Sequence, residues 1–374
     1  MKIGLIAHYG EDYYKSRHDF VSYLEEKGNK CFAFVPEDDY KVKIDKLTSD
    51  VFYYKYSRNW KFVFSLISVF KLFTRKFKEE QPEIVFTYKF FPNLVGILAA
   101  KSAQVPNIIA TIAGIGFLEN YRKNPFIWFV FKLYMIVLDK ANIVIAQNKE
   151  DLNLLKKNLQ KAKVIMTHGS GVNAVNFVNK NDFLDDFLMK NNLSKEKKYI
   201  GFCSRIVKEK GIIELVKAFN SVDSSYDLLI AGWFDETKIE VAVLNLIKGN
   251  PKIHYLGYQE NVSEFLEVTE FIVLPSYYPE GVPRSLIEAL SLSKAIITTD
   301  HKGCKETCID NLNGFLVRPK SIEDLKNTFL KIEELSDVKL NSFKENSLKL
   351  FLEKFDREIV YKTIWESILS YRKF

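Results

Sequence analysis

The stretch that decides the fold is residues 271–290, FIVLPSYYPEGVPRSLIEAL. Four consecutive apolar residues, 271–274, predict a buried parallel strand. A polar loop follows, and Pro283 suits the first turn of a helix. A strand, a loop and a helix in this order are the building block of a doubly wound α/β sheet.

The same alternation of short apolar runs and amphipathic helices extends in both directions along the chain. In the first half we expect strands at Ile3–Ala7, Cys31–Val35, Ile84–Thr87, Ile108–Thr111, Ile143–Ala146 and Val164–Met166. In the second half we expect strands at Tyr199–Cys203, Leu228–Ala231, Ile253–Tyr255, Phe271–Leu274 and Ala295–Thr298, followed by smaller elements. The polar stretch between the halves predicts a linker. We therefore expect one domain at 1–170, a linker at 171–196, a second domain at 197–355, and a terminal helix at 356–374 that returns to the first domain.

Composition agrees with two globular domains. The chain has 374 residues, 47% of them apolar and 27% charged, which excludes intrinsic disorder and favours two domains of roughly 150 residues or more. We expect no signal peptide, because the first apolar run is short and acidic residues follow it at once. No uninterrupted apolar run approaches the roughly 18 residues of a spanning helix. The net charge of +7 is compatible with anionic ligands or an anionic surface.

The loop and helix after residue 274 predict a site for an anionic, sugar-bearing ligand. Glycine in the loop lets the backbone approach a ligand, and the free N–H groups at a helix start can bind an anion. Carboxylates near that point can accept hydrogen bonds from sugar hydroxyls. The candidates are Glu280, Gly281, Val282, Arg284, Ser285, Leu286 and Glu288. The alternative is that both glutamates are ordinary solvated surface residues.

The segment EGVPRSLIE resembles the Glu-x7-Glu motif of the retaining nucleotide-sugar glycosyltransferases of glycosyltransferase family four, and the resemblance extends from Ile253 to Leu325. It implies an α/β fold of the GT-B type, with two Rossmann-like doubly wound domains facing across a cleft. It also implies that Glu288 binds the ribose of a UDP-sugar, and that Glu280 and the Gly281–Val282 backbone hold the sugar. The stretch GCKET, residues 303–307, is most similar to bacterial members that build capsule, O-antigen or lipid-linked oligosaccharides. Among them are the N-acetylgalactosaminyltransferases that extend undecaprenyl-diphosphate-linked diacetylbacillosamine.

Two cations follow the predicted strand at 199–203. Arg205 and Lys210 stand five residues apart, and two cations at a strand end can stabilise a leaving diphosphate. Their spacing resembles the family's Arg-x4-Lys clamp, whereas Lys208 between them is expected to be solvated. A solvated turn is the alternative for the pair. Tyr258, within the matched stretch, is a further donor-binding candidate.

The N-terminal half offers fewer candidates. After the first strand, Gly10 corresponds to the family's loop that faces the donor, and His8 is either a base or sugar ligand or a packing residue. Gly114 and Gly116 resemble a Gly-x-Gly that makes room for a sugar on the acceptor side, or form a simple turn. No Asp-x-Asp occurs, and neither the four cysteines nor the remaining histidines have the spacing of a metal site. We expect no metal and no other cofactor.

The basic excess is concentrated between Lys55 and Lys78. Seven cations and no acidic residue are interleaved there with aromatic and aliphatic residues; the cations are Lys55, Arg58, Lys61, Lys71, Arg75, Lys76 and Lys78. This pattern predicts a basic amphipathic helix in an anionic membrane interface, and Tyr121–Lys140 with Trp128 is a second candidate contact. A core helix with a charged outer face is the alternative. No nucleic-acid module is visible.

Together these features predict a retaining transferase at the cytoplasmic face of the membrane. We expect it to move a sugar, N-acetylgalactosamine in the first instance, from a UDP-sugar to a polyprenyl-diphosphate-linked glycan. The alternatives are another donor (a UDP-hexose or GDP-mannose) in capsule or O-antigen synthesis, or a non-catalytic membrane-binding protein of the same fold. A phosphorylase would need a far longer chain, and an epimerase should lack the Glu280/Glu288 spacing.

Overall fold

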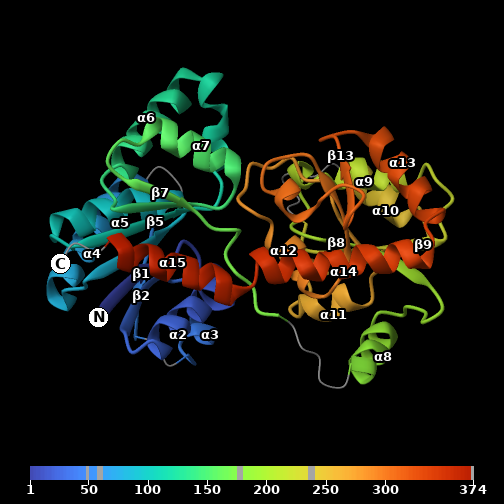
Figure 1. The fold of residues 1–374 in the computed structure, drawn as a ribbon, viewed down its shortest axis with the longest axis horizontal. Helices are drawn as coiled ribbons and strands as arrows, with labels where there is room; N and C mark the ends of the chain where they lie inside the picture. Colours follow the sequence, from blue (N-terminus) through green and yellow to red (C-terminus); the bar gives the residue numbers. More distant parts are fainter. Residues whose placement is uncertain (48–49, 57–61, 175–179, 235–240, 372–374) are drawn as a thin grey trace. The chain divides into compact units, whose positions relative to one another are not determined.

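The computed structural model describes residues 1–47, 50–56, 62–174, 180–234 and 241–371 (Figure 1). The chain divides into two compact units. Unit 1 comprises Met1–Ser170 and Val360–Phe374, and unit 2 comprises Gly171–Ile359. Each unit is built on one parallel sheet, which confirms the predicted α/β class with two doubly wound domains.

The sheet of unit 1 has seven parallel strands in the order β3-β2-β1-β4-β5-β6-β7. The strands are β1 (Lys2–Ile6), β2 (Lys30–Pro36), β3 (Asp50–Tyr54), β4 (Ile84–Tyr88), β5 (Asn107–Ile112), β6 (Ile143–Ala146) and β7 (Lys163–Met166). Six of them were predicted. The edge strand β3, whose residues are mostly half-buried, was not predicted.

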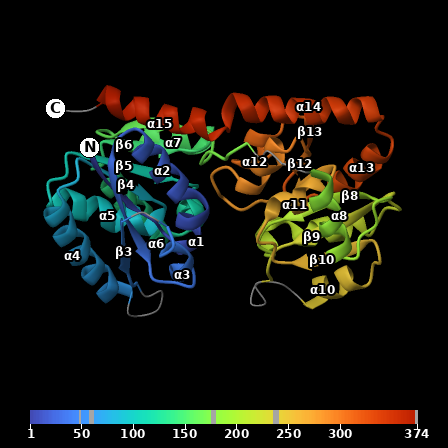
Figure 2. The ribbon, with the colours of Figure 1, turned by 90° about the horizontal axis from the view of Figure 1, so that it is seen from below.

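Helices cover both faces of this sheet. They are α1 (Gly10–Asp12), α2 (His18–Glu26), α3 (Lys41–Ile44), α4 (Phe62–Glu80), α5 (Phe90–Ser102), α6 (Pro125–Leu138), α7 (Lys149–Asn158) and the C-terminal α15 (Arg357–Tyr371). One face packs against α4, α5 and α6, and the other packs against α2 and α15 (Figure 2). Tyr361 of α15 contacts the rings of Phe20 and Tyr23 at centroid distances of 4.9 and 5.3 Å. The C-terminal helix therefore belongs to the core of unit 1.

The position of α4 corrects one expectation. Val69, Phe73 and Phe77, spaced four residues apart, are buried in the core of unit 1. Phe34 of β2 contacts Phe73 at a ring-centroid distance of 4.7 Å. The apolar stripe that we assigned to a membrane interface therefore covers the sheet, and α4 is a core helix with a charged outer face. Its i, i+4 spacing is the same for both roles, so the pattern alone could not distinguish them.

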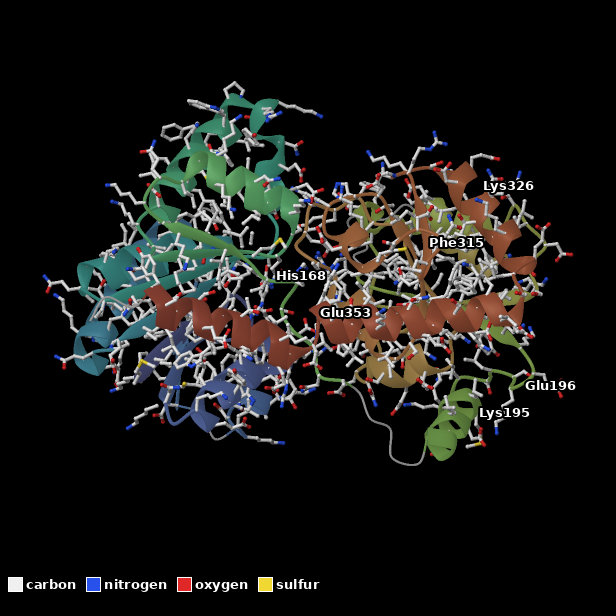
Figure 3. All side chains as sticks on the ribbon, in the orientation of Figure 1. His168, Lys195, Glu196, Phe315, Lys326 and Glu353 are labelled. Atoms are coloured by element: carbon white, nitrogen blue, oxygen red, sulfur yellow. The ribbon has the colours of Figure 1, made fainter. Side chains whose placement is uncertain are left out.

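The sheet of unit 2 has six parallel strands in the order β10-β9-β8-β11-β12-β13. The strands are β8 (Lys198–Cys203), β9 (Tyr226–Ala231), β10 (Ile253–Gly257), β11 (Phe271–Leu274), β12 (Ala295–Thr299) and β13 (Gly314–Val317). The first five were predicted, and β13 was not. Its Phe315, labelled in Figure 3, packs edge to face on Phe343 of helix α14 (Asp337–Lys354) at a ring-centroid distance of 5.4 Å.

The helices of unit 2 are α8 (Lys180–Lys190), α9 (Ile212–Phe219), α10 (Val241–Lys248), α11 (Val262–Glu267), α12 (Arg284–Ser291), α13 (Ile322–Glu333) and α14 (Asp337–Lys354). The expected linker at 171–196 contains α8, whose Phe187 and Leu188 are buried in the core of unit 2. That part of the stretch is therefore packed structure. Among the described residues, no helix is both long and apolar enough to cross a membrane.

Strand order in each sheet reverses at one point, between β1 and β4 in unit 1 and between β8 and β11 in unit 2. In open α/β sheets, ligands bind at the carboxyl ends of the strands beside such a switch point. The loops after β8 and β11 carry Arg205, Lys210 and Glu280, and they are the first place to look for chemistry.

Candidate active site

Lys210 and Glu280 meet at the switch point of unit 2. The Lys210 ammonium lies 2.5 Å from Glu280 Oε1, and the two side chains are 7% and 21% exposed. The lysine comes from the 3₁₀ turn Lys208–Lys210 after β8, and the glutamate from the loop after β11. The structure thus brings together two of the three residues that we predicted to be catalytic.

The two loops are fixed to each other through their backbones. Gly211 has a left-handed φ of 78°, and a Cβ at this position would lie 2.2 Å from the carbonyl oxygen of Pro275. The N–H of Tyr277 donates to the carbonyl of Glu209 over 2.9 Å. Only glycine permits this close approach, so Gly211 holds the Lys210 turn against the Glu280 loop.

The loop after β12 supports the Glu280 loop from the other side. Gly303 has a φ of 79°, and a Cβ there would lie 1.6 Å from the carbonyl oxygen of Gly281. The Thr299 hydroxyl donates to the Ser276 carbonyl over 2.5 Å. The adjacent Cys304 is fully buried, and burial, with Glu280 nearby, raises the pKa of its thiol to about 12. The thiol of Cys304 is therefore neutral and inert. The role of this segment is structural, because Gly303 allows it to pack closely against the loop that carries Glu280.

Arg205, the second predicted cation, lies in a different environment. It is exposed, and no ion-pair partner for it is found in the described parts of the chain. A cation that is not neutralised by the protein is available to an anionic ligand. Lys208 is also exposed, as expected for a solvated residue of the same turn.

Helix α12 starts at the site, with Pro283 as its N-cap residue. The Arg284 Nε donates to Glu288 Oε1 over 2.7 Å, so one oxygen of the carboxylate predicted to bind ribose already has a protein partner. Ser285 at the second helical position is half-buried, while Gly281 and Val282 are buried in the preceding loop. These residues place a helix N-terminus beside Glu280.

The prediction for Leu286 is wrong in one respect. Its N–H donates to the carbonyl of Pro283 over 3.2 Å, and its side chain is fully buried. The 3₁₀-type hydrogen bond of the first helical turn occupies this donor. Leu286 therefore packs the helix onto the sheet, and the N–H groups of Arg284 and Ser285 remain the candidates for an anion.

Two exposed aromatic side chains stand at the carboxyl ends of β9 and β10. Tyr258 was predicted, and Trp233 was not. The N–H of Ile206 donates to the Trp233 carbonyl over 3.1 Å, so the tryptophan backbone adjoins the Arg205 loop. The sequence could have indicated Trp233 as a candidate. A large aromatic residue directly after the run LLIAG stands where a strand usually ends in small or polar residues.

At the matching edge of unit 1, the Gly10 N–H already has a protein acceptor. This N–H donates to Asp38 Oδ2 over 2.7 Å, and a Cβ on the glycine would lie 2.1 Å from Asp38 Oδ1. Asp38 follows β2, so a side chain from a neighbouring loop accepts from the N–H that was expected to face the donor. His8 follows β1 and stacks edge to face on Tyr9 at a centroid distance of 4.2 Å.

A charged cluster beside β4 escaped the sequence analysis. Arg17 lies 3.5 Å from Asp12 and over the Tyr88 ring, and the Lys89 ammonium lies 3.4 Å from the same carboxylate. Burial alone would raise the pKa of Asp12, but the two cations lower it to about 2. The three charged residues come from two segments of the chain, residues 12–17 and residue 89, so no local spacing could reveal the cluster.

The remaining unit 1 candidates divide into turn and surface residues. Gly114 and Gly116 have φ values of 84° and 54°, which the turn after β5 requires. On α4, Lys71 and Arg75 are exposed, and Lys76 pairs with Glu79 over 2.7 Å. Lys61 lies outside the described residues.

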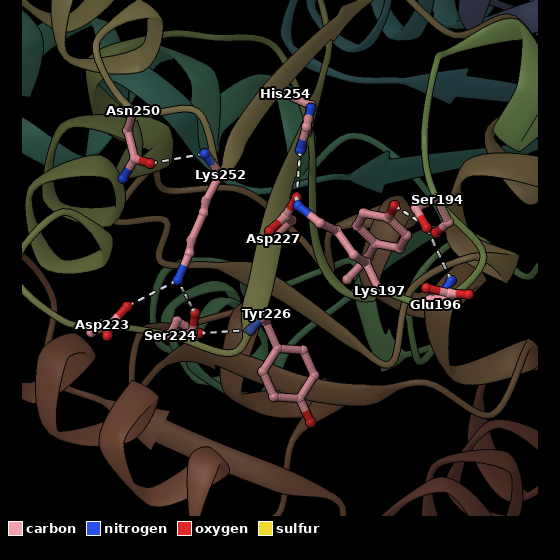
Figure 4. A network of polar contacts seen from close by, with 11 residues as sticks. Ser194, Glu196, Lys197, Asp223, Ser224, Tyr226, Asp227, Asn250, Lys252 and His254 are labelled. Carbon is pink, nitrogen blue, oxygen red and sulfur yellow. Dashed lines mark hydrogen bonds and ion pairs between the residues drawn. The ribbon is translucent and has the colours of Figure 1, made fainter.

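The polar network around Asp227 has a structural position. Asp227 is buried and lies 2.6 Å from Lys197 and 2.7 Å from His254 (Figure 4). These residues are at the amino ends of β8, β9 and β10, opposite the proposed site. In the described ranges of the chain, no group of three or more His, Cys, Asp or Glu side chains has the geometry of a metal site.

Comparisons with known proteins agree with this arrangement. The family model described as Glycosyl transferase 4-like matches residues 2–148, and the model described as Glycosyl transferases group 1 matches residues 185–350. The N,N'-diacetylbacillosaminyl-diphospho-undecaprenol alpha-1,3-N-acetylgalactosaminyltransferase of Campylobacter jejuni is 25% identical over 91% of this chain and 92% of its own.

A second curated relative is the UDP-Gal:alpha-D-GlcNAc-diphosphoundecaprenol alpha-1,3-galactosyltransferase of Escherichia coli, 25% identical over 75% of this chain and 73% of its own. Among solved structures, a glycosyltransferase from Rickettsia africae has a TM-score of 0.81 at 20% identity, covering 100% of this chain and 98% of the other. Anabaena HepE in complex with UDP and glucose has a TM-score of 0.82 at 15% identity, covering 99% and 100%.

Proposed function

The chain is a glycosyltransferase with a glycosyl transferase 4-like domain followed by a glycosyl transferases group 1 domain, and from this premise we propose that it transfers a sugar from a UDP-sugar to a polyprenyl-diphosphate-linked glycan. The observation that carries the proposal is the buried Lys210 beside Glu280, with Arg205 exposed on the same loop. Cations at this edge of a parallel sheet match the needs of a diphosphate leaving group.

In the proposed complex the donor lies along the carboxyl ends of β8 and β11. Arg205, unpaired among the described residues, brings its positive charge to the diphosphate, Lys210 donates to it through the ammonium N–H groups that Glu280 leaves available, and the N–H groups at the start of α12 add partial positive charge. Glu288 accepts a hydrogen bond from the ribose through the oxygen that Arg284 leaves available. Glu280, held by Lys210, is oriented toward the sugar hydroxyls. Preorganised charges of this kind stabilise the transition state more than the ground state.

We propose that the reaction retains the anomeric configuration. The acceptor hydroxyl attacks the face that the diphosphate leaves, and the leaving phosphate oxygen takes the acceptor proton. The sugar–oxygen bond to the diphosphate breaks as the bond to the acceptor forms, so charge and protons balance without a protein nucleophile. Arg205 and Lys210 supply the positive charge at the diphosphate, which is why the proposal includes no metal.

The acceptor proposal rests on the relatives. The names of the Campylobacter and Escherichia enzymes specify diphospho-undecaprenol acceptors, and the latter names a UDP-sugar donor. N-acetylgalactosamine is the proposed donor sugar, because two Campylobacter relatives transfer it according to their names. We place the reaction at the cytoplasmic membrane face, where the acceptor side of the protein meets the lipid-linked glycan.

The test is a transfer assay with a panel of UDP-, GDP- and dTDP-sugars, polyprenyl-diphosphate sugars in detergent as acceptors, and EDTA throughout. The proposal expects one UDP-sugar to give a lipid-linked product whose new linkage has the donor's anomeric configuration. Transfer only from a GDP- or dTDP-sugar, or only after a divalent metal is added, would contradict it.

A further inference from the structure

Helix α6 has two apolar faces. Phe131, Tyr134, Met135 and Leu138 are buried against unit 1, as a core helix requires. The opposite side carries five large apolar residues that are between 45% and 74% exposed: Phe126, Trp128, Phe129, Leu133 and Ile136. Four of these follow the helical spacing 126, 129, 133, 136 and therefore form one continuous stripe. A stripe of this kind on a single 14-residue helix marks an interaction surface.

The charges around this stripe are positive. Helix α6 contains no acidic residue, and its one charged residue, Lys132, lies 5.9 Å from the centre of the Trp128 ring. Arg122, Lys123 and Lys140 flank the helix and are exposed. Asp139, which follows the helix, accepts hydrogen bonds from the N–H groups of residues 160–162, which turns its carboxylate toward the protein. The other acid near α6, Glu119 of the preceding 3₁₀ helix Gly116–Arg122, is half-buried.

The neighbouring helices extend the positive surface. Helix α5 packs between α4 and α6, and the three cover the same face of the unit 1 sheet. The outer side of α4 exposes Lys71, Arg75 and Lys78 together with one acid, Glu79, which lies 3.7 Å from Arg75. One helical layer thus presents an apolar stripe on α6 and cations on both α4 and α6.

We propose that the exposed stripe of α6 inserts into the interface of an anionic lipid bilayer, with the surrounding cations on the headgroups. Tryptophan and phenylalanine at the level of the headgroups, with lysine and arginine beside them, are typical of helices that lie in a membrane surface. Anionic lipid neutralises the cations. A second copy of the chain packed symmetrically on α6 would instead bring Lys132 and its neighbours toward like charges. The inference rests on the proposed function, because it names the surface from which a lipid-linked acceptor is reached.

The experiment measures flotation of the full chain with vesicles of phosphatidylcholine alone and of phosphatidylcholine mixed with phosphatidylglycerol. The Phe129→Ser/Leu133→Ser variant removes the centre of the stripe. Its control, Leu330→Ser/Leu352→Ser, changes two equally exposed residues of unit 2. The inference expects at least a tenfold loss of binding for the first variant, because each side chain loses the burial that lipid provides. The control should bind as the wild type does.

Two further measurements separate the contribution of the cations to vesicle binding from that of the apolar stripe. Lys123→Gln/Lys132→Gln should weaken binding to the mixed vesicles about thirtyfold and leave the weak binding to pure phosphatidylcholine unchanged. Brominated lipids should quench tryptophan fluorescence in the wild type, and the quenching should be lost in Trp128→Phe.

The inference is overturned if the wild type binds neither vesicle, or if the stripe variant floats as the wild type does. It is also overturned if the stripe variant only converts a dimer to a monomer in light scattering. Vesicle binding is measured without substrates, so a protein that binds but transfers nothing would refute the proposed function and leave this inference standing. Conversely, normal transfer to a water-soluble acceptor analogue without vesicle binding would refute only this inference.

Discussion

Replacing Lys210 by methionine should lower both activity and stability. The ammonium lies 2.5 Å from Glu280 and is only 7% exposed, while the carboxylate is 21% exposed. Removing one partner of a buried pair leaves an uncompensated charge, which typically lowers the free energy of unfolding by about 3–5 kcal/mol. Because Glu280 retains some solvent contact, we expect the free energy of unfolding to fall by about 3 kcal/mol. Turnover should fall about 10²–10³-fold, the usual loss for one preorganised group at a developing charge.

Two variants on the same loop serve as comparisons. Arg205→Met should lose a similar factor in turnover, yet its unfolding free energy should change by less than about 0.5 kcal/mol, because Arg205 is exposed and makes no ion pair in the described structure. Lys208→Met, two residues from Lys210, should change neither quantity. Steady-state transfer and urea denaturation measure the two effects. Near-normal turnover in Lys210→Met, in protein shown to be folded, would refute the assignment of the diphosphate site.

Three further predictions concern a buried charge in unit 1, and a loop and two thiols in unit 2. Asp12→Asn should lower the unfolding free energy at neutral pH by at least about 2 kcal/mol, because the pKa of Asp12 is lowered from 3.8 to about 2 in the folded protein. The difference in unfolding free energy between variant and wild type should therefore disappear as the pH falls from 3.8 to about 2. Acid denaturation measures this dependence. Gly303→Ala should weaken UDP binding measured by calorimetry, since its Cβ would meet the Gly281 carbonyl at 1.6 Å; unaltered binding would mean that the loop is not part of the site. Cys304 and Cys308, whose thiols are buried with raised pKa values, should react with a thiol reagent only after denaturation, and rapid reaction in the native protein would contradict the packing.

The sequence was sufficient for the parts of the fold that repeat a strong pattern. Central strands such as β1 and β11 are continuous apolar runs buried on both faces, and this property is visible residue by residue. Of the four edge strands that the structure describes, β7 and β10 were predicted from their apolar runs, whereas β3 and β13 were missed. Short, partly buried strands of this kind are therefore the part of the fold that the pattern indicates least securely.

Helices α4 and α6 show that the sequence alone also could not predict which helix exposes an apolar surface. Both are rich in apolar residues and have cations within or beside the helix, and the sequence favoured α4 as the membrane element. In the structure the apolar stripe of α4 covers the sheet, because β2 and β3 present Phe34 and Phe52 to it. Helix α6 has apolar residues on both sides, so one side remains exposed after the core is covered. Counting residues by type could not separate these cases.

The site shows a similar division. Glu280 and Lys210 were predicted from two motifs, and their contact follows from the adjacency of β8 and β11. The occupation of Gly10 by Asp38 depends on a side chain from a different loop, and no local spacing encodes it. Local motifs therefore identified the residues at strand ends, whereas contacts between loops had to come from the structure.

The central claim is that the carboxyl edge of the unit 2 sheet binds the nucleotide diphosphate. Amide hydrogen exchange with and without UDP, in the presence of EDTA, tests it most directly. The account predicts slower exchange in two segments of unit 2, residues 204–211 and 276–286, with the amino-end network around Asp227 unchanged. Protection that is absent from both segments, or that requires a divalent metal, would contradict it.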